Sequence, residues 1–247
     1  SANSIAIGNK AGQTGQNSSS ISIGTLAGTD TQREDSIAIG TEAGETRQLE
    51  NSIAIGKQAG ETDQSSNSIA IGTTAGYLDQ SENAIAIGYE AGKTGQNQWG
   101  VAIGLKAGTT TQGNRSVAIG LFAGATNQDV GSVALGAYSA ATDQGKKCIA
   151  IGHSAAKINQ GDNSIGIGTT AGWTNQGDDS VAIGKQTGEH DQSTNCIAIG
   201  SFAGQTNQKS ESIAVGYRAG FVNQDASSIA IGRFAGNTNQ STSSVAV

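Results

Sequence analysis

The sequence contains no proline, no methionine and only two cysteines, and aromatic residues make up 4% of its 247 residues. Its 14 basic residues are outnumbered by 20 acidic ones, which gives a formal net charge of −6. Because a nucleic acid backbone binds to a basic surface, we expect no nucleic acid partner. Two cysteines are too few for a disulfide scaffold. No apolar run approaches the ~20 residues of a spanning helix, so we expect no membrane insertion.

Glycine, in contrast, is abundant, with 37 residues that fall into an internal repeat of 16 residues. Fifteen units run from Ser4 to Ser243 without insertion or deletion, and residues 244–247 begin another. We number each unit from the position of Ser4. Position 5 is then always glycine, position 13 is always glutamine, and positions 2 and 4 are always Ile, Val or Leu. So short a unit does not form a helical repeat, but it fits one coil of a β-solenoid.

The Ser-Ile-Ala-Ile segment of each unit alternates large and small residues, which is typical of a strand with one buried face. Stacking the coils about 4.8 Å apart would place equal positions in straight columns, in a rod of roughly 70 Å. We expect the aliphatic columns at positions 2 and 4, together with alanine at position 8, to point inward as the core. Threonine at position 11 would be semi-buried, and positions 12 and 14 to 16 would form turns, position 12 carrying residues that tolerate positive φ. The sequence therefore predicts one all-β domain over residues 1–247, a parallel β-solenoid or β-roll of about fifteen coils.

The invariant glutamine at position 13 stands beside neighbours that vary freely. Stacked glutamine amides form hydrogen-bonded ladders in cross-β assemblies. The alternative is that each glutamine caps the turn of its own coil. The candidate ladder comprises Gln16, Gln32, Gln48, Gln64, Gln80, Gln96, Gln112 and Gln128.

Small uncharged residues at positions 1, 3 and 5 would form a flat outward stripe if the aliphatic columns point inward. Two core aliphatics per coil contribute about 3 to 6 kcal/mol, whereas ordering sixteen residues costs on the order of 20 kcal/mol. Burial of an outer face would help to offset that cost, so we expect chains to associate side by side as a homo-oligomer. The predicted interface comprises Ala6, Ala38, Ala54, Ala70 and Ala102.

All ten aromatic residues occupy positions 6, 7, 10 or 16, which predicts that they lie on the surface. Exposed rings often mark contact surfaces. They either bind a glycan or a host-surface protein, or they pack between protomers. The candidate contact residues are Trp99, Trp173, Phe202, Phe221 and Phe234.

Motifs of catalysis and of metal or cofactor binding are weak in this chain. The run Gly166–Ala171 matches a dinucleotide fingerprint only because glycine replaces the usual alanine, and no helix pattern follows it. His153 and His190 have no second ligand at metal-binding spacing. Cys148 and Cys196 lie three coils apart, about 14 Å, which exceeds the roughly 7 Å that a disulfide tolerates. Without insertions to build a cleft, we expect no enzyme, no metal and no cofactor.

The run Ser-Ile-Ala-Ile-Gly-x-x-Ala-Gly, at Ser36–Gly44 and Ser52–Gly60, resembles the head repeats of trimeric autotransporter adhesins. It is also similar to repeats that precede chaperone domains in phage and giant-virus fibres. The resemblance implies a left-handed parallel β-roll assembled as a trimer, extracellular at a cell surface or on a virion, and adhesive rather than enzymatic. The unit here departs from the adhesin repeat by an added Thr-x-Gln segment.

The leading functional hypothesis is a structural and adhesive fibre module, which oligomerises laterally and presents a surface for attachment. One alternative is ice binding by the hydroxyl groups of the threonine column at position 11. The other is a filament subunit that stacks end to end, because no amphipathic helix or irregular loop covers the first or last coil.

Overall fold

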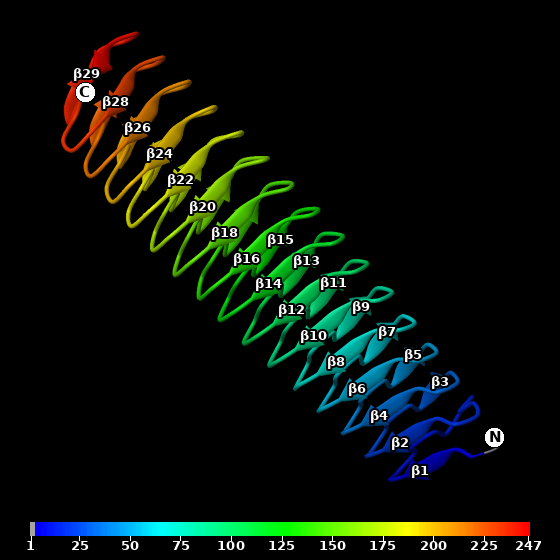
Figure 1. Ribbon diagram of the computed structural model, residues 1–247. Helices are drawn as coiled ribbons and strands as arrows, with labels where there is room; N and C mark the ends of the chain where they lie inside the picture. The colour runs from blue at the N-terminus through cyan, green and yellow to red at the C-terminus, as the bar shows by residue number, and fades with distance from the viewer. Residues whose placement is uncertain (1–2) are drawn as a thin grey trace. The chain divides into compact units, whose positions relative to one another are not determined.

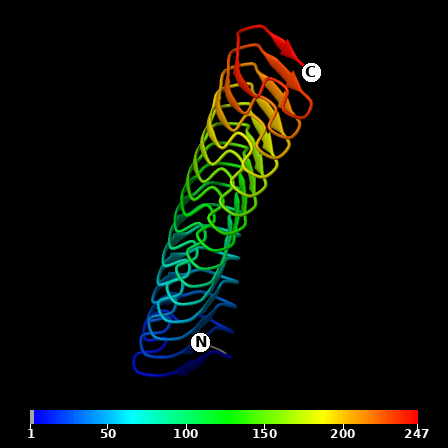
Figure 2. The ribbon, with the colours of Figure 1, turned by 90° about the vertical axis from the view of Figure 1, so that its left-hand side faces the viewer.

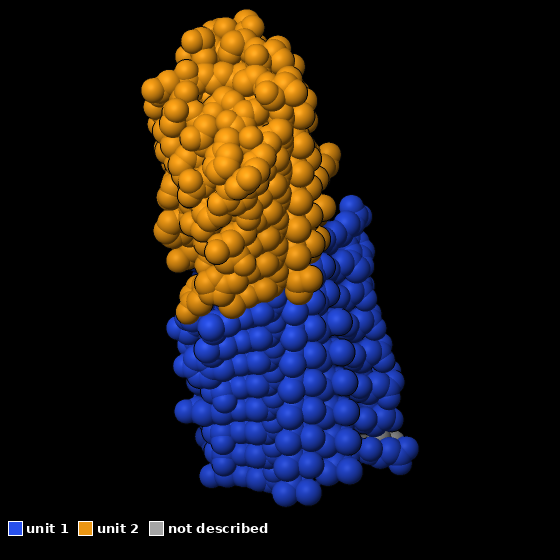
Figure 3. Space-filling view, turned by 60° about the vertical axis from the view of Figure 1, so that its left-hand side comes forward, with its two compact units in different colours: residues 1–126 blue, residues 127–247 orange. Residues whose placement is uncertain are grey.

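The computed structural model describes residues 3–247 and shows an all-β parallel β-solenoid of about fifteen turns with a 16-residue period (Figure 1). This confirms the predicted fold class. The chain divides into two compact units, residues 1–126 and residues 127–247, which are coloured separately in Figure 3. The prediction of a single domain over residues 1–247 stays a prediction. Among the described residues, no helix has the length and apolar character needed to cross a membrane.

Almost every turn contributes two three-residue strands, one at positions 2 to 4 and one at positions 11 to 13. In the first unit, the sheet of positions 2 to 4 comprises β1 (Ile5–Ile7), β2 (Ile21–Ile23), β4 (Ile37–Ile39), β6 (Ile53–Ile55), β8 (Ile69–Ile71), β10 (Ile85–Ile87), β12 (Val101–Ile103) and β14 (Val117–Ile119). The second sheet there comprises β3 (Asp30–Gln32), β5 (Thr46–Gln48), β7 (Thr62–Gln64), β9 (Leu78–Gln80), β11 (Thr94–Gln96) and β13 (Thr110–Gln112). Strand β15 (Thr126–Gln128) includes the boundary between the units.

The second unit repeats the two sheets. The sheet of positions 2 to 4 comprises β16 (Val133–Leu135), β18 (Ile149–Ile151), β20 (Ile165–Ile167), β22 (Val181–Ile183), β24 (Ile197–Ile199), β26 (Ile213–Val215), β28 (Ile229–Ile231) and β30 (Val245–Ala246). The sheet of positions 11 to 13 comprises β17 (Thr142–Gln144), β19 (Ile158–Gln160), β21 (Thr174–Gln176), β23 (His190–Gln192), β25 (Thr206–Gln208), β27 (Val222–Gln224) and β29 (Thr238–Gln240).

Equal positions of neighbouring coils lie beside one another. In the first sheet Ile39 pairs with Ile55, and in the second Gln48 pairs with Gln64, all strands being parallel. Figure 2 shows the coils as successive loops, and Figure 3 shows side chains of the first unit aligned in straight rows. The constant unit length therefore sets the register, as the sequence predicted.

Every coil bends at five positions with positive φ, namely 5, 7, 9, 12 and 16. Position 5 requires glycine, because Gly72 has a φ of +127° and a Cβ there would lie 2.6 Å from the carbonyl oxygen of Gly88. The positive φ expected at position 12 is confirmed, but its placement in a turn is wrong, since Arg47 of β5 has a φ of +55° inside a strand. One left-handed residue in a strand acts like a bulge and changes which side chains face inward.

The interior is built from small and polar side chains, which reverses the predicted orientation of the first sheet. Ala38 and Ser52 are fully buried, whereas Ile37 and Ile39 are only half-buried and point outward. The cause is the thinness of the coil, because a Cβ added to Gly44 would already lie 3.3 Å from the Cβ of Ala38. Two such close walls leave no room for isoleucine. The inward alanine at position 8 is confirmed, as at Ala27, Ala43, Ala59, Ala75, Ala91 and Ala107.

Candidate functional surfaces

The glutamine column forms a buried ladder through the interior of each unit. The Nε2 of Gln48 donates to the Oε1 of Gln64 at 3.1 Å, and the Nε2 of Gln64 donates to the Oε1 of Gln80 at the same distance. Each Nε2 also donates across its own coil, as from Gln64 to the carbonyl oxygen of Ile53 at 2.8 Å. The same amide therefore bonds both the next coil and a strand carbonyl oxygen on the opposite side of its own coil. Hydrogen bonds of the ladder also join Gln32 to Gln48, Gln80 to Gln96, Gln96 to Gln112, and Gln128 to Gln144.

The ladder changes at its two ends. Gln16 donates to the hydroxyl group of Ser22, which in turn donates to the Oε1 of Gln32 at 2.5 Å, so Ser22 lies between the two amides. Near the other end, the Oε1 atoms of Gln224 and Gln240 are buried and accept no hydrogen bond. The amide-to-amide hydrogen bonds are therefore regular between these two irregular stretches.

The outward side of the first sheet is apolar. We call the outward side chains of positions 2 and 4 the isoleucine face. Within it, Ile55 is 36% exposed and Ile199 is 38% exposed, and most of the others are half-buried. An apolar surface that repeats from coil to coil in this way is typical of an interaction site.

The alanines predicted to form the oligomer interface do not lie on this surface. The side chains of Ala38, Ala54, Ala70 and Ala102 are 0% exposed and face the interior, so they are unable to line an interface. Ala6 is exposed because it belongs to the first described coil. The interface prediction placed the stripe on the wrong face of the strand, and the isoleucine face is the surface that the structure leaves open.

Positions 6, 7 and 10 of successive coils form one edge of the solenoid, which we call the 6-7-10 edge. In the first unit this edge contains a group of carboxylates, Glu42, Glu45 and Glu61, among an equal number of acidic and basic residues overall. Burial and the neighbouring charge of Glu42 raise the pKa of both Glu45 and Glu61. The negative charge of Glu61 raises the pKa of the Tyr77 hydroxyl group, which hydrogen-bonds to it. The Oε2 of Glu61 is buried and has no hydrogen-bond partner.

In the second unit the same edge is aromatic and basic. We call the following residues the aromatic–arginine cluster: Phe202, Tyr217, Arg218, Phe221, Arg233 and Phe234. Its rings meet edge to face across neighbouring coils, with centroids 5.9 Å apart for Phe202 and Tyr217 and 5.5 Å apart for Tyr217 and Phe234. The guanidinium group of Arg218 lies 4.9 Å from the centroid of the Phe221 ring.

All five candidate aromatics lie outside the core, as predicted. Phe202, Phe221 and Phe234 come together in the cluster, whereas Trp99 and Trp173 do not belong to it. Trp99 packs against the guanidinium group of Arg115 at 5.1 Å, and Trp173 packs against the ring of His190 at 5.3 Å. The arginines of the cluster were not among the predicted contact residues, although the 16-residue period places them beside the rings.

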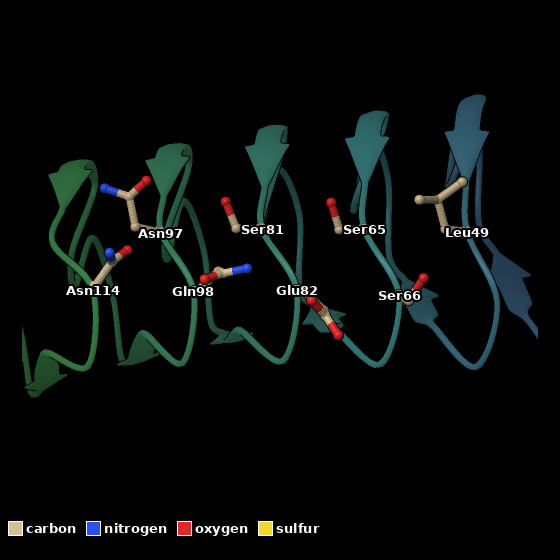
Figure 4. A pocket seen from close by; sticks show the side chains of 8 residues that line it. All are labelled: Leu49, Ser65, Ser66, Ser81, Glu82, Asn97, Gln98 and Asn114. Carbon is tan, nitrogen blue, oxygen red and sulfur yellow. The ribbon is translucent and has the colours of Figure 1, made fainter.

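A shallow polar groove follows positions 14 and 15 of the first unit (Figure 4). Mostly polar side chains from successive coils line it: Leu49, Ser65, Ser66, Ser81, Glu82, Asn97, Gln98 and Asn114. It gathers no nucleophile with an adjacent base, which is the arrangement that covalent catalysis needs.

Residues with metal or thiol chemistry are scattered. Across residues 3–247, no group of three or more His, Cys, Asp or Glu side chains is placed to hold a metal ion. Cys148 and Cys196 are free, as expected, and buried, and burial raises the pKa of both thiols. The Sγ of Cys148 donates to the carbonyl oxygen of Gly161 at 2.8 Å.

The threonine column at position 11 forms a single outward row in the second sheet. Thr46 and Thr62 are half-buried, as expected, and Leu78 interrupts the row. The neighbouring position 13 of the same strands carries a buried glutamine rather than a hydroxyl group, as at Gln48 and Gln64.

Residues 112–139 match the family model of the YadA head domain repeat, in two copies. This match supports the resemblance of the repeats to the heads of trimeric autotransporter adhesins. Repeats of this kind are non-catalytic structural domains of adhesins exposed at the cell surface. No curated protein matches the chain.

Proposed function

We propose that this chain is a non-enzymatic structural and adhesive module of an extracellular fibre. It would assemble as a homotrimer through its isoleucine faces and present the remaining surface for attachment at the cell surface. The YadA head repeats at residues 112–139 support this function, because heads of that family are trimeric adhesins.

The isoleucine face is the observation that carries the proposal. Two columns of branched aliphatic side chains lie outside the coil, while the buried side chains of the described residues are mostly alanine, serine and glutamine. Burying apolar side chains contributes about 25 cal/mol per Å², so most of the hydrophobic stabilisation open to this chain requires a partner surface. A second and third copy supply such a surface, since the same flat face repeats on each protomer.

The mass of the protein in solution tests this proposal. Sedimentation at micromolar concentration should give three times the 24.7 kDa of one chain. Replacing Ile39, Ile55 and Ile71 by serine should shift the mass towards one chain. The control variant Leu49→Ser removes an aliphatic side chain outside the isoleucine face and should leave the mass unchanged. A wild-type chain that sediments as a monomer would overturn the proposal.

A further inference from the structure

The aromatic–arginine cluster combines exposed rings with cations that have no acidic partner. Tyr217 is 41% exposed and Phe234 is 43% exposed. Among the described residues, neither Arg218 nor Arg233 forms an ion pair with a carboxylate, and the Nε of Arg218 is buried without a hydrogen-bond partner. Arg218 is half-buried and Arg233 is exposed, so the guanidinium groups that stack on the rings are also open to a ligand of opposite charge.

The backbone fixes the spacing of these groups. The N–H of Phe234 donates to the carbonyl oxygen of Tyr217 at 3.0 Å, which places position 7 of one coil beside position 6 of the preceding coil. Arg233 therefore stands next to Phe234, its guanidinium group 4.8 Å from that ring and 5.9 Å from the ring of Tyr217. Lys185 adds a third cation, 5.9 Å from the ring of Phe202.

Guanidinium groups that stack on rings keep their in-plane N–H donors available. Those donors match the two oxygens of a carboxylate or sulfate group. Aromatic rings next to them offer flat apolar faces, and the cations recur on coils that follow one another. The ligand that suits both features is a chain of rings carrying regularly spaced anionic groups.

We propose that the aromatic–arginine cluster binds an acidic polysaccharide, with Arg218 and Arg233 holding its carboxylate or sulfate groups and with Tyr217 and Phe234 packing against its sugar rings. The inference rests on the proposed adhesive function, because it names the class of ligand to which the module attaches. The 6-7-10 edge of the first unit carries four glutamates beside its four lysines, so we expect it to attract such a polymer less than the edge of the second unit does.

An acidic peptide or a nucleic acid would pair with the arginines equally well, but it would pack less of its surface against the aromatic rings. Phe202 and Phe234 occupy a position with φ of +62° and +63°, a conformation that bulky side chains disfavour. Placing partly exposed rings there costs stability without burying them in the core. The rings therefore favour the polysaccharide over the other polyanions.

Binding of the full chain to immobilised heparin, a sulfated and carboxylated polysaccharide, tests the proposal. We expect the double variant Arg218→Ala, Arg233→Ala to weaken binding by about ten-fold or more. Phe234→Leu, which keeps the apolar bulk but removes the ring, should weaken it less. The matched control Lys146→Ala, Lys209→Ala also removes two positive charges, but from the turn at positions 14 and 15, and it should leave heparin binding unchanged.

Several outcomes would overturn the inference. The first is a wild-type chain that does not bind heparin. The second is a lysine control variant that binds heparin as weakly as the arginine variant does. The third is a wild-type chain that binds polyglutamate or duplex DNA as tightly as heparin. Neutral dextran should not bind. Sedimentation of the same samples separates the two proposals, because a trimer that ignores heparin contradicts only the ligand, and a monomer that binds it contradicts only the trimer.

Discussion

The side-chain amide of Gln48 donates to the side-chain oxygen of Gln64 in the next coil at 3.1 Å, with both residues completely buried. Glutamine amides thus take the place that aliphatic side chains occupy in most β-folds. Amides such as those of Gln48 and Gln64 each satisfy a backbone carbonyl oxygen and a neighbouring amide at once, which makes this part of the interior a connected polar network. Such a network stabilises only when every member is satisfied.

Removing one amide should therefore destabilise the fold. In Gln64→Leu, the carbonyl oxygen of Ile53 and the Oε1 of Gln80 both lose a donor, and Gln48 loses its acceptor. Each buried unsatisfied group costs about 1 to 3 kcal/mol, so we expect a fall in melting temperature of several degrees by circular dichroism. The exposed amide variant Asn97→Ala serves as the control and should melt like the wild type. Equal melting of Gln64→Leu and the wild type would contradict a structural ladder.

Glycine at position 5 should be irreplaceable, whereas another glycine with positive φ tolerates a side chain. At Gly72 a Cβ would lie 2.6 Å from the backbone oxygen of Gly88, which belongs to the next coil and has no room to move. At Gly95, with a φ of +64°, the nearest atom would be 3.9 Å away. We expect Gly72→Ala to cost more than about 3 kcal/mol and Gly95→Ala about 1 kcal/mol. Urea unfolding of the two variants measures both, and similar losses would contradict the close approach of the coils.

The two cysteines should resist thiol reagents while the protein is folded. Burial raises the pKa of the Cys148 and Cys196 thiols, which lowers the fraction of reactive thiolate and also shields the sulfur atoms. We expect reaction with iodoacetamide at pH 8 to be slow in buffer and fast in urea, as followed by mass spectrometry. Rapid alkylation of the folded chain would show that the coils open locally.

Glu61 should make the protein less stable at neutral pH than at acidic pH. Burial, followed by the charges of Glu42 and Glu45, raises the pKa of Glu61. A carboxyl group with a higher pKa in the folded chain binds more protons there, so its contribution to stability is lost as the pH rises through the raised value. Glu61→Gln should therefore raise the melting temperature at pH 7. The corresponding gain in the free energy of unfolding should be less than about 1 kcal/mol, because the site is partly solvated.

The gain from Glu61→Gln should vanish near pH 4, where the wild-type carboxyl group is protonated in the folded chain. Glu82→Gln, which removes one charge from the turn at positions 14 and 15, controls for net charge. A gain that persists at pH 4, or one that the control reproduces, would assign the effect to something other than the ionisation of Glu61.

The repeat alone was enough to predict the solenoid and the register, because equal spacing forces Gln48 beside Gln64 whichever way the strands face, but it left the glutamine ladder as one of two alternatives. It was not enough to orient the first sheet. Alternation shows that Ala54 and Ala70 share one face and Ile55 and Ile71 the other, but inside and outside are decided by how closely the two walls approach. Handedness also stays a prediction. The arginine at 218 was open to prediction, since the period aligns it with the ring at position 7 of other coils.

The reversed orientation of the first sheet itself gives a sharp prediction. Ala70 is fully buried, so Ala70→Leu should overpack the coil and cost about 1 to 3 kcal/mol at every protein concentration. Ile71 lies one residue further on the isoleucine face, so Ile71→Ser should weaken the protein only where chains associate. Thermal unfolding over a range of protein concentrations separates the two effects. If Ile71→Ser were as damaging in dilute monomer as Ala70→Leu, the isoleucine column would belong to the core of the coil, and the trimer interface proposed on it would have to lie elsewhere.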